Sequence, residues 1–136
     1  MKRFIKKVLV IFSVCMLLPS SALAAGKGTK VNKIDWEPVM EAIIQVESRG
    51  NKNAVSGNSV GAMQITPILV AECNQILKKR KSKKKFKLSD RFSIAKSKEM
   101  FLLIQSAHNP LNNIEQAIRS WNGGLNYSAR RTQRYF

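Results

Sequence analysis

Glu47 is the residue of this chain whose type and position best suit acid–base chemistry. It follows Met40, Ile43 and Ile44 at the spacing of one helical face, and Gly50 ends the expected helix just beyond it. A carboxyl group on the apolar side of a helix loses hydration, which allows it to stay protonated and act as a general acid near neutral pH. Judged by spacing alone, a second interpretation is favoured, in which Glu47 is an ordinary glutamate at a helix end that tilts into solvent.

Other catalytic and metal-binding patterns are not supported by the residues present. The single histidine, His108, precedes Asn-Pro in an expected turn, and no G-x-S-x-G segment exists, so we do not expect a Ser-His-Asp hydrolase. No glycine-rich phosphate-binding motif occurs. One histidine and one cysteine, Cys73, remain once residues 1–25 are set aside, which is too few for a His/Cys metal cluster. We expect no metal and no cofactor, and we expect Cys73 to be a small buried side chain rather than a reactive thiol.

Several motifs around and beyond Glu47 resemble those of the soluble lytic transglycosylases, a family of the lysozyme-like superfamily. ESRG, at 47–50, matches the family's E-S-x-G, and Ser56 follows the glutamate by nine residues as in that family. GAMQITP, at 61–67, matches G-L-M-Q-[IL]-x-P with alanine in place of leucine. SWNGG, at 120–124, resembles A-Y-N-A-G, and TQRYF resembles the family's late tyrosine motif.

The resemblance implies a compact helical lysozyme-like domain with a catalytic cleft that cuts the β-1,4 bond between N-acetylmuramic acid and N-acetylglucosamine in peptidoglycan. Glu47 would protonate the glycosidic oxygen and then take a proton from the muramoyl 6-hydroxyl, which closes a 1,6-anhydro ring. The substrate's N-acetyl group can support the developing charge, so no second carboxylate is required. The residues that the resemblance places against the glycan strand are Ser48, Ser56, Met63, Gln64, Trp121, Asn122 and Tyr135.

Three alternatives remain open. A lysozyme-type hydrolase on the same fold would use water in place of the 6-hydroxyl group. A non-catalytic wall-binding module of a secretion or conjugation apparatus would keep the fold without the chemistry. A cationic binder of nucleic acid or membrane would act through its basic residues alone. For Trp121 core packing is as well supported as sugar contact, and for Met63 core packing is slightly favoured.

The elements that must position these residues are expected to be helices, so the class is all-α, within the α+β lysozyme-like superfamily but with little or no sheet. Asp35 is expected to cap the first helix, and a second helix should start at Thr66-Pro67. A third helix is expected from near Ser89 through Ser106, where His108-Asn109-Pro110 breaks it. A fourth is expected from Asn113 to the Asn-Gly-Gly at 122–124. At most a small hairpin is expected in the loop at 51–61.

The start of the chain and its charge predict an exported basic protein. Residues 1–25 combine a basic beginning, an apolar run and Ala22-Leu23-Ala24, which is typical of a cleaved signal peptide and of delivery to the periplasm or cell envelope. Residues 26–34 read as a polar lead and 35–136 as the catalytic domain. The formal charge of +16 becomes +12 once the four cations of the signal are removed (16 − 4).

The stretch KKRKSKKKFK, Lys78 to Lys87, contains eight basic residues in ten. We expect it to be an exposed helix end or loop that holds the protein near an anionic wall or membrane surface. Glycan strands of peptidoglycan are the principal expected partner. Nucleic acid is not expected as a partner, and the protein is expected to be a monomer.

Overall fold

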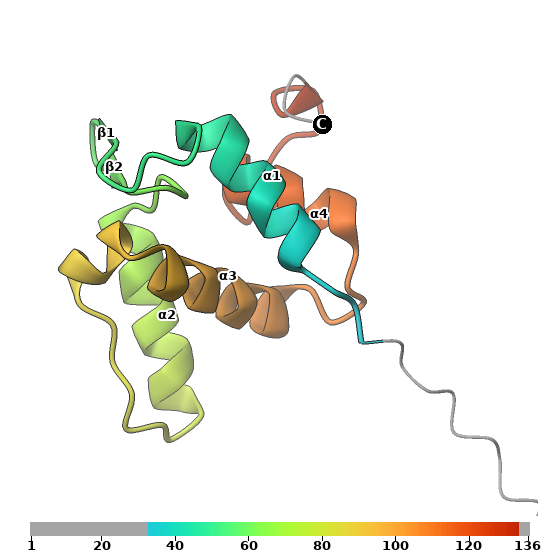
Figure 1. The fold of residues 1–136 in the computed structure, drawn as a ribbon. Coiled ribbons are helices and arrows are strands. Elements are labelled where there is room, and N and C mark those ends of the chain that lie inside the picture. Colours follow the sequence, from blue (N-terminus) through green and yellow to red (C-terminus); the bar gives the residue numbers. More distant parts are fainter. Residues whose placement is uncertain (1–32, 134–136) are drawn as a thin grey trace, which may run out of the picture. The chain divides into compact units, whose positions relative to one another are not determined.

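Four α-helices, one 3-10 helix and one two-stranded hairpin make up residues 33–133, the part of the chain that this computed structural model describes (Figure 1). The expected signal peptide, most of the polar lead and Tyr135 lie outside this range. In chain order the elements are α1 (Glu37–Ser48), β1 (Val55–Ser56), β2 (Ser59–Val60), α2 (Pro67–Lys79), η1 (Leu88–Phe92), α3 (Ile94–His108) and α4 (Ile114–Gly123). The prediction of a helical fold with very little sheet is confirmed. No helix between residues 33 and 133 combines the length and apolarity needed to cross a membrane.

Side-chain caps explain where α2 and α4 begin. The Thr66 hydroxyl oxygen accepts a hydrogen bond from the Leu69 N–H group at 3.2 Å. The Asn113 side chain accepts one from the Gln116 N–H group at 2.9 Å. Each cap pairs one of the N–H groups that the first turn of a helix leaves without a helical partner. Both predicted helix starts are confirmed.

Two other predicted helix starts are wrong. The cap of α1 is Trp36, while the Asp35 carboxylate accepts a hydrogen bond from the N–H group of Glu37. The third helix does not run on from Ser89, because residues 88–92 form the separate helix η1. Ser93 is extended between the two helices and caps α3 with its hydroxyl group, so the continuous helix starts only after it.

One aromatic cluster joins the helices that later form the site. Phe101 of α3 is fully buried and its ring lies 5.6 Å from that of Trp36 and 5.2 Å from that of Trp121 in α4, measured between centroids. Met40 and Ile43, on the apolar face of α1, are buried in the same core. Edge-on packing of Trp36 and tilted packing of Trp121 on Phe101 add to the hydrophobic gain, so the core fixes α1 and α4 against α3.

Cys73 lies on the buried side of α2 with no exposed surface, as predicted for a structural cysteine. Burial is the main cause that raises the pKa of its thiol from 9.0 to about 12. The folded state therefore keeps a proton that the unfolded chain would release. This contribution to stability is complete below pH 9 and is lost as the pH rises from about 9 towards 12.

We expect Cys73 to resist a thiol-specific reagent at pH 8 in the native protein and to react at once when denaturant unfolds the chain. The thiolate is the reactive form, and burial removes both the thiolate and the access to it. A Cys15→Ser background leaves Cys73 as the single thiol to be followed. Rapid modification of the native protein would contradict the buried placement.

Candidate active site

The helix that carries Glu47 ends immediately after it. Arg49 and Gly50 both take left-handed backbone angles, with φ of 54° and 83°. Their N–H groups donate to the carbonyl oxygens of Gln45 and Ile44, at 3.0 and 3.3 Å, and so close the last turn. This double closure is a standard way to satisfy the carbonyl groups at a helix end. It leaves Glu47 half-buried in the final turn of α1, where the chain turns away.

The GAMQ motif forms a tight loop, Gly61–Gln64, between two residues that pair like neighbouring strands. Val60 and Ile65 exchange two backbone hydrogen bonds, of 3.1 and 2.9 Å, which close the loop at its base. Gly61 has a φ of 80°, and a Cβ atom at this position would lie 1.9 Å from the carbonyl oxygen of Arg91. Only glycine fits there, which explains the first residue of the motif.

The carbonyl groups of this loop receive hydrogen bonds from the ESRG and SWNGG motifs. The Ser48 hydroxyl group, next in sequence to Glu47, donates to the Ala62 carbonyl oxygen at 2.8 Å. The Trp121 indole N–H group donates to the Met63 carbonyl oxygen at 3.1 Å. Ser48 lies 14 residues before Ala62, and Trp121 lies 58 residues after Met63. Both are thereby fixed to adjacent peptide groups of the loop. The structure brings the three motifs together at one loop.

Gln64 completes the loop from within. Its backbone φ is 50°, a left-handed angle that is uncommon for a residue with a side chain and often marks a functional position. The side-chain amide donates to the Gly61 carbonyl oxygen at 2.9 Å and reaches that of Ala54 at 3.5 Å. The amide N–H groups thus tie the loop to the segment before the hairpin, while the residue itself also lines the adjacent pocket.

A pocket of about 360 Å³ opens beside the loop, within the size range of small-ligand sites. Three of the predicted binding residues line it: Gln64, Trp121 and Asn122. Glu47 is not among its lining residues. The remaining lining residues are mainly apolar: Ile68, Leu69, Ile104, Gly124 and Leu125. Thr66, Glu72 and Ser120 add polar groups. An aromatic ring, amides and hydroxyl groups in one hollow suit a sugar, which offers both apolar faces and hydroxyl groups.

The other predicted binding residues lie in different surroundings. Ser56 is exposed on β1, in the hairpin pair with Ser59. The Met63 side chain is fully buried in the core, so this residue meets the rest of the site through its carbonyl group. Ser48 is occupied with Ala62. Tyr135 lies outside the described residues.

The segment that leads to Tyr135 is anchored to α4. Thr132, which begins the TQRYF stretch, is buried and its hydroxyl oxygen accepts a hydrogen bond from the Arg119 guanidinium group at 3.0 Å. Gly123 allows this packing, because a Cβ atom there would approach Tyr127 and Thr132 to 2.7 and 2.9 Å. The Asn-Gly-Gly motif thus both contributes Asn122 to the pocket and leaves room for the tail.

Glu72 is a pocket residue that the sequence reasoning did not assign to the site. It lies on α2, and its carboxylate is 3.0 Å from the Nε2 atom of His108, at the end of α3. The available signal was its spacing, since Glu72 follows Leu69 by three residues and precedes Ile76 by four. Between residues 33 and 133, no three His, Cys, Asp or Glu side chains gather as a metal site would require.

Trp121→Phe is expected to lower the free energy of unfolding by about 1–2 kcal/mol and to reduce activity. The phenyl ring keeps the contact with Phe101 but cannot donate to the Met63 carbonyl group, which then lacks this partner. Chemical denaturation and an assay for release of wall fragments measure both effects. Trp36→Phe makes the same change in the other tryptophan that packs on Phe101. A larger loss of activity in Trp36→Phe would contradict the role given to the Trp121 hydrogen bond.

The elements and the site define a helical lysozyme-like domain in which a helix-end glutamate, a GAMQ loop and a tryptophan-bearing helix meet. The model of the Transglycosylase SLT domain family matches residues 24–135. The chain belongs to this family, whose members are transglycosylases that cleave peptidoglycan. No curated protein and no solved structure matches the chain.

Proposed function

We propose that this protein is an exported lytic transglycosylase that uses Glu47 as its acid and then as its base. The observation that carries the proposal is the pair of hydrogen bonds from Ser48 and Trp121 to adjacent carbonyl groups of the GAMQ loop. They fix the end of α1 to a loop whose last residue, Gln64, lines the pocket. A catalytic acid needs a held position relative to its substrate, and the anchored end of α1 supports that role for Glu47.

The remaining carboxylates support a mechanism with one acid. The chain has eight acidic residues, all within the described range, and none of the eight, Glu47 included, is without a partner. Two accept backbone N–H groups (Asp35 and Asp90), and five pair with a cationic or histidine side chain (Glu37, Glu41, Glu72, Glu99 and Glu115). Asp90 accepts the Lys87 N–H group and Glu99 pairs with Lys84, so both carboxylates already have structural roles. A second catalytic carboxylate is unnecessary when the substrate's N-acetyl group stabilises the charge at the anomeric carbon.

In the proposed reaction the Glu47 carboxyl group gives its proton to the glycosidic oxygen as the bond to the anomeric carbon breaks. The resulting carboxylate then takes the proton of the muramoyl 6-hydroxyl group, whose oxygen attacks the anomeric carbon and closes the anhydro ring. One proton leaves Glu47 and one returns, so the enzyme is restored without water. Trp121 and the amides of Gln64 and Asn122 would hold the sugar chain in the pocket.

Export by a cleaved signal peptide belongs to this proposal, since the substrate lies outside the cytoplasm. It is supported by the basic, apolar and small-residue pattern of residues 1–25. N-terminal sequencing of the secreted protein should begin after Ala24 or Ala25. A mature protein that still carries Met1 would contradict the cleavage.

The proposed chemistry is tested by counting reducing ends in purified peptidoglycan digested by the enzyme. Ring closure produces fragments that lack a new reducing end, so soluble fragments should accumulate without a matching rise in borohydride-reducible sugar. A rise in step with the fragments would show a lysozyme-type hydrolase instead. No soluble fragments at all would favour a non-catalytic wall-binding module.

A further inference from the structure

The basic run from Lys78 to Lys87 begins in the last turn of α2 and continues as a loop with fixed ends. At the end of α2, the Ser82 N–H group donates to the Leu77 carbonyl oxygen at 3.0 Å, around a left-handed Lys81 with φ of 54°. At the other end, Phe86 is buried with 3% of its surface exposed. A run of like charges without such anchors would be expected to extend and move freely.

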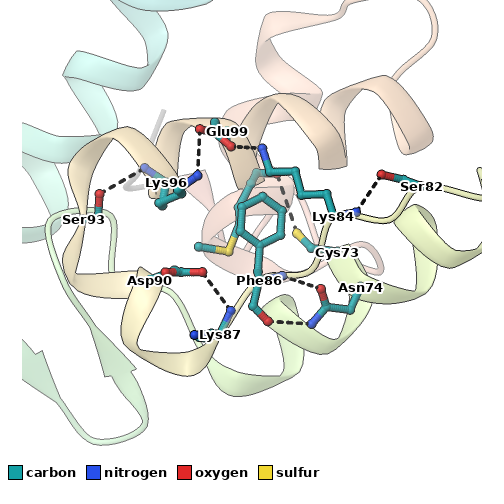
Figure 2. A network of polar contacts seen from close by, with 11 residues as sticks. Cys73, Asn74, Ser82, Lys84, Phe86, Lys87, Asp90, Ser93, Lys96 and Glu99 are labelled. Carbon is teal, nitrogen blue, oxygen red and sulfur yellow. Dashed lines mark hydrogen bonds and ion pairs between the residues drawn. The ribbon is translucent and has the colours of Figure 1, made fainter.

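Asn74 of α2 holds the far end of this loop from both sides. Its amide nitrogen donates to the Phe86 carbonyl oxygen at 2.9 Å, and its amide oxygen accepts from the Phe86 N–H group at 2.8 Å. Figure 2 shows this two-way contact beside the Lys84–Glu99 ion pair. The Lys84 ammonium group lies 5.1 Å from the centre of the Phe86 ring. The Lys84 hydrogen bond is the main cause that lowers the pKa of Glu99. The fold therefore commits one lysine to holding the loop.

The other basic residues of the run are exposed, and four of them, together with Lys84, surround a hollow. In the part of the chain that the structure describes, the Lys84–Glu99 pair is the only ion pair that the run makes. A hollow of about 630 Å³ is lined by five lysines and three polar residues, with Ala71 as its apolar member: Asn74, Gln75, Lys78, Lys81, Ser82, Lys83, Lys84 and Lys85. Cations held close together repel one another, and a bound polyanion relieves this repulsion.

We propose that this hollow, the Lys78–Lys85 hollow, is a docking site for a linear phosphodiester polymer of the cell wall, separate from the glycan-cleaving site. Ammonium groups are compact cations that bind phosphate as point charges. The lining offers no aromatic ring for the stacking that single-stranded nucleic acids use. It also lacks the apolar face with which an interfacial segment enters a bilayer. The assignment of the polymer to the wall rests on the proposed function, whereas the phosphate chemistry rests on the hollow itself.

The test is equilibrium binding of the Glu47→Gln protein to poly(glycerol phosphate) at several salt concentrations. We expect affinity that falls steeply as salt rises, because binding releases counterions. Lys81→Gln, Lys83→Gln and Lys85→Gln combined should weaken binding roughly 100-fold, on a scale of about fivefold for each charge lost. A control with Lys33→Gln, Lys52→Gln and Arg130→Gln removes the same charge from exposed positions elsewhere and should lose far less. Equal losses in the two variants would overturn the proposal in favour of net charge alone.

Asn74→Ala tests the built geometry, since it retains every charge but releases Phe86. We expect binding to weaken several-fold, because the loop is no longer held in its binding arrangement. Unchanged affinity would contradict the claim that the hollow is preformed. Tighter binding to phosphatidylglycerol vesicles, which carry the same headgroup on a bilayer, would assign the surface to membrane. Tighter binding to duplex DNA would assign it to nucleic acid. Because no glycan enters this assay, its outcome is independent of whether the protein cleaves peptidoglycan.

Discussion

Glu47→Gln should lower the rate at which purified peptidoglycan is solubilised by about 100-fold or more, while the protein stays folded. Glutamine has the shape of glutamate but cannot give a proton to the glycosidic oxygen or take one from the 6-hydroxyl group. Both steps of the proposed reaction are therefore lost, and general acid–base groups typically contribute 10²–10⁴-fold each. The decline in turbidity of wall suspensions measures the rate, and circular dichroism checks that the helices remain.

Glu41→Gln is the matched control for this variant. It makes the same chemical change on the same helix, at an exposed residue that pairs with Lys98. Lys98 keeps its second partner, Glu37, and surface ion pairs contribute about 1 kcal/mol or less, so activity should stay near that of the unchanged protein. Wall lysis retained in Glu47→Gln, or lost equally in Glu41→Gln, would refute the catalytic assignment of Glu47.

Gly61→Ala should lower the free energy of unfolding by about 3 kcal/mol, because it adds a methyl group where there is no room for one. The added Cβ atom would lie 1.9 Å from the Arg91 carbonyl oxygen, a backbone atom that moves only if η1 moves. The left-handed φ of 80° adds strain for any residue with a side chain. Activity should fall as well, because Gly61 begins the loop that joins the three motifs.

Gly57→Ala separates the two causes of this loss. Gly57, in the turn of the hairpin, also has a left-handed φ, 58°, but an added Cβ atom there meets nothing within 4 Å. Its cost should be that of the backbone angle alone, about 1 kcal/mol. Urea denaturation of both variants gives the comparison. If Gly61→Ala is no less stable than Gly57→Ala, the close contact with Arg91 does not constrain the loop.

The sequence predicted best what depends on neighbouring residues. The caps at Thr66 and Asn113 were predictable because a cap bonds to an N–H group three residues away. The buried positions of α1 and α2 followed from helical spacing, as the burial of Ile43 and Cys73 shows. Ser93 was harder, since its extended conformation splits a stretch whose composition suits one continuous helix.

The contacts that assemble the site could not be predicted in this way. Helical spacing tells which face of a helix is buried, but not which carbonyl group a side chain reaches. The hydrogen bond from Trp121 to the Met63 carbonyl group spans 58 residues, and the positive φ of Gln64 depends on the closed loop around it. Family resemblance supplied the grouping of the motifs, and the structure adds the backbone contacts that hold them together. Glu72 shows the converse case, a pocket residue on a predictable helix face that no motif marked.

The most direct test of the central claim, that the sugar's own 6-hydroxyl group closes the ring with Glu47 as acid and base, is mass spectrometry of peptidoglycan digested in heavy-oxygen water. The proposed reaction predicts muramoyl ends that are lighter by one water molecule than hydrolytic ends and that contain no heavy oxygen. Glu47→Gln should yield neither kind of end. Muramoyl ends that incorporate heavy oxygen from the solvent would contradict the account and identify the protein as a hydrolase.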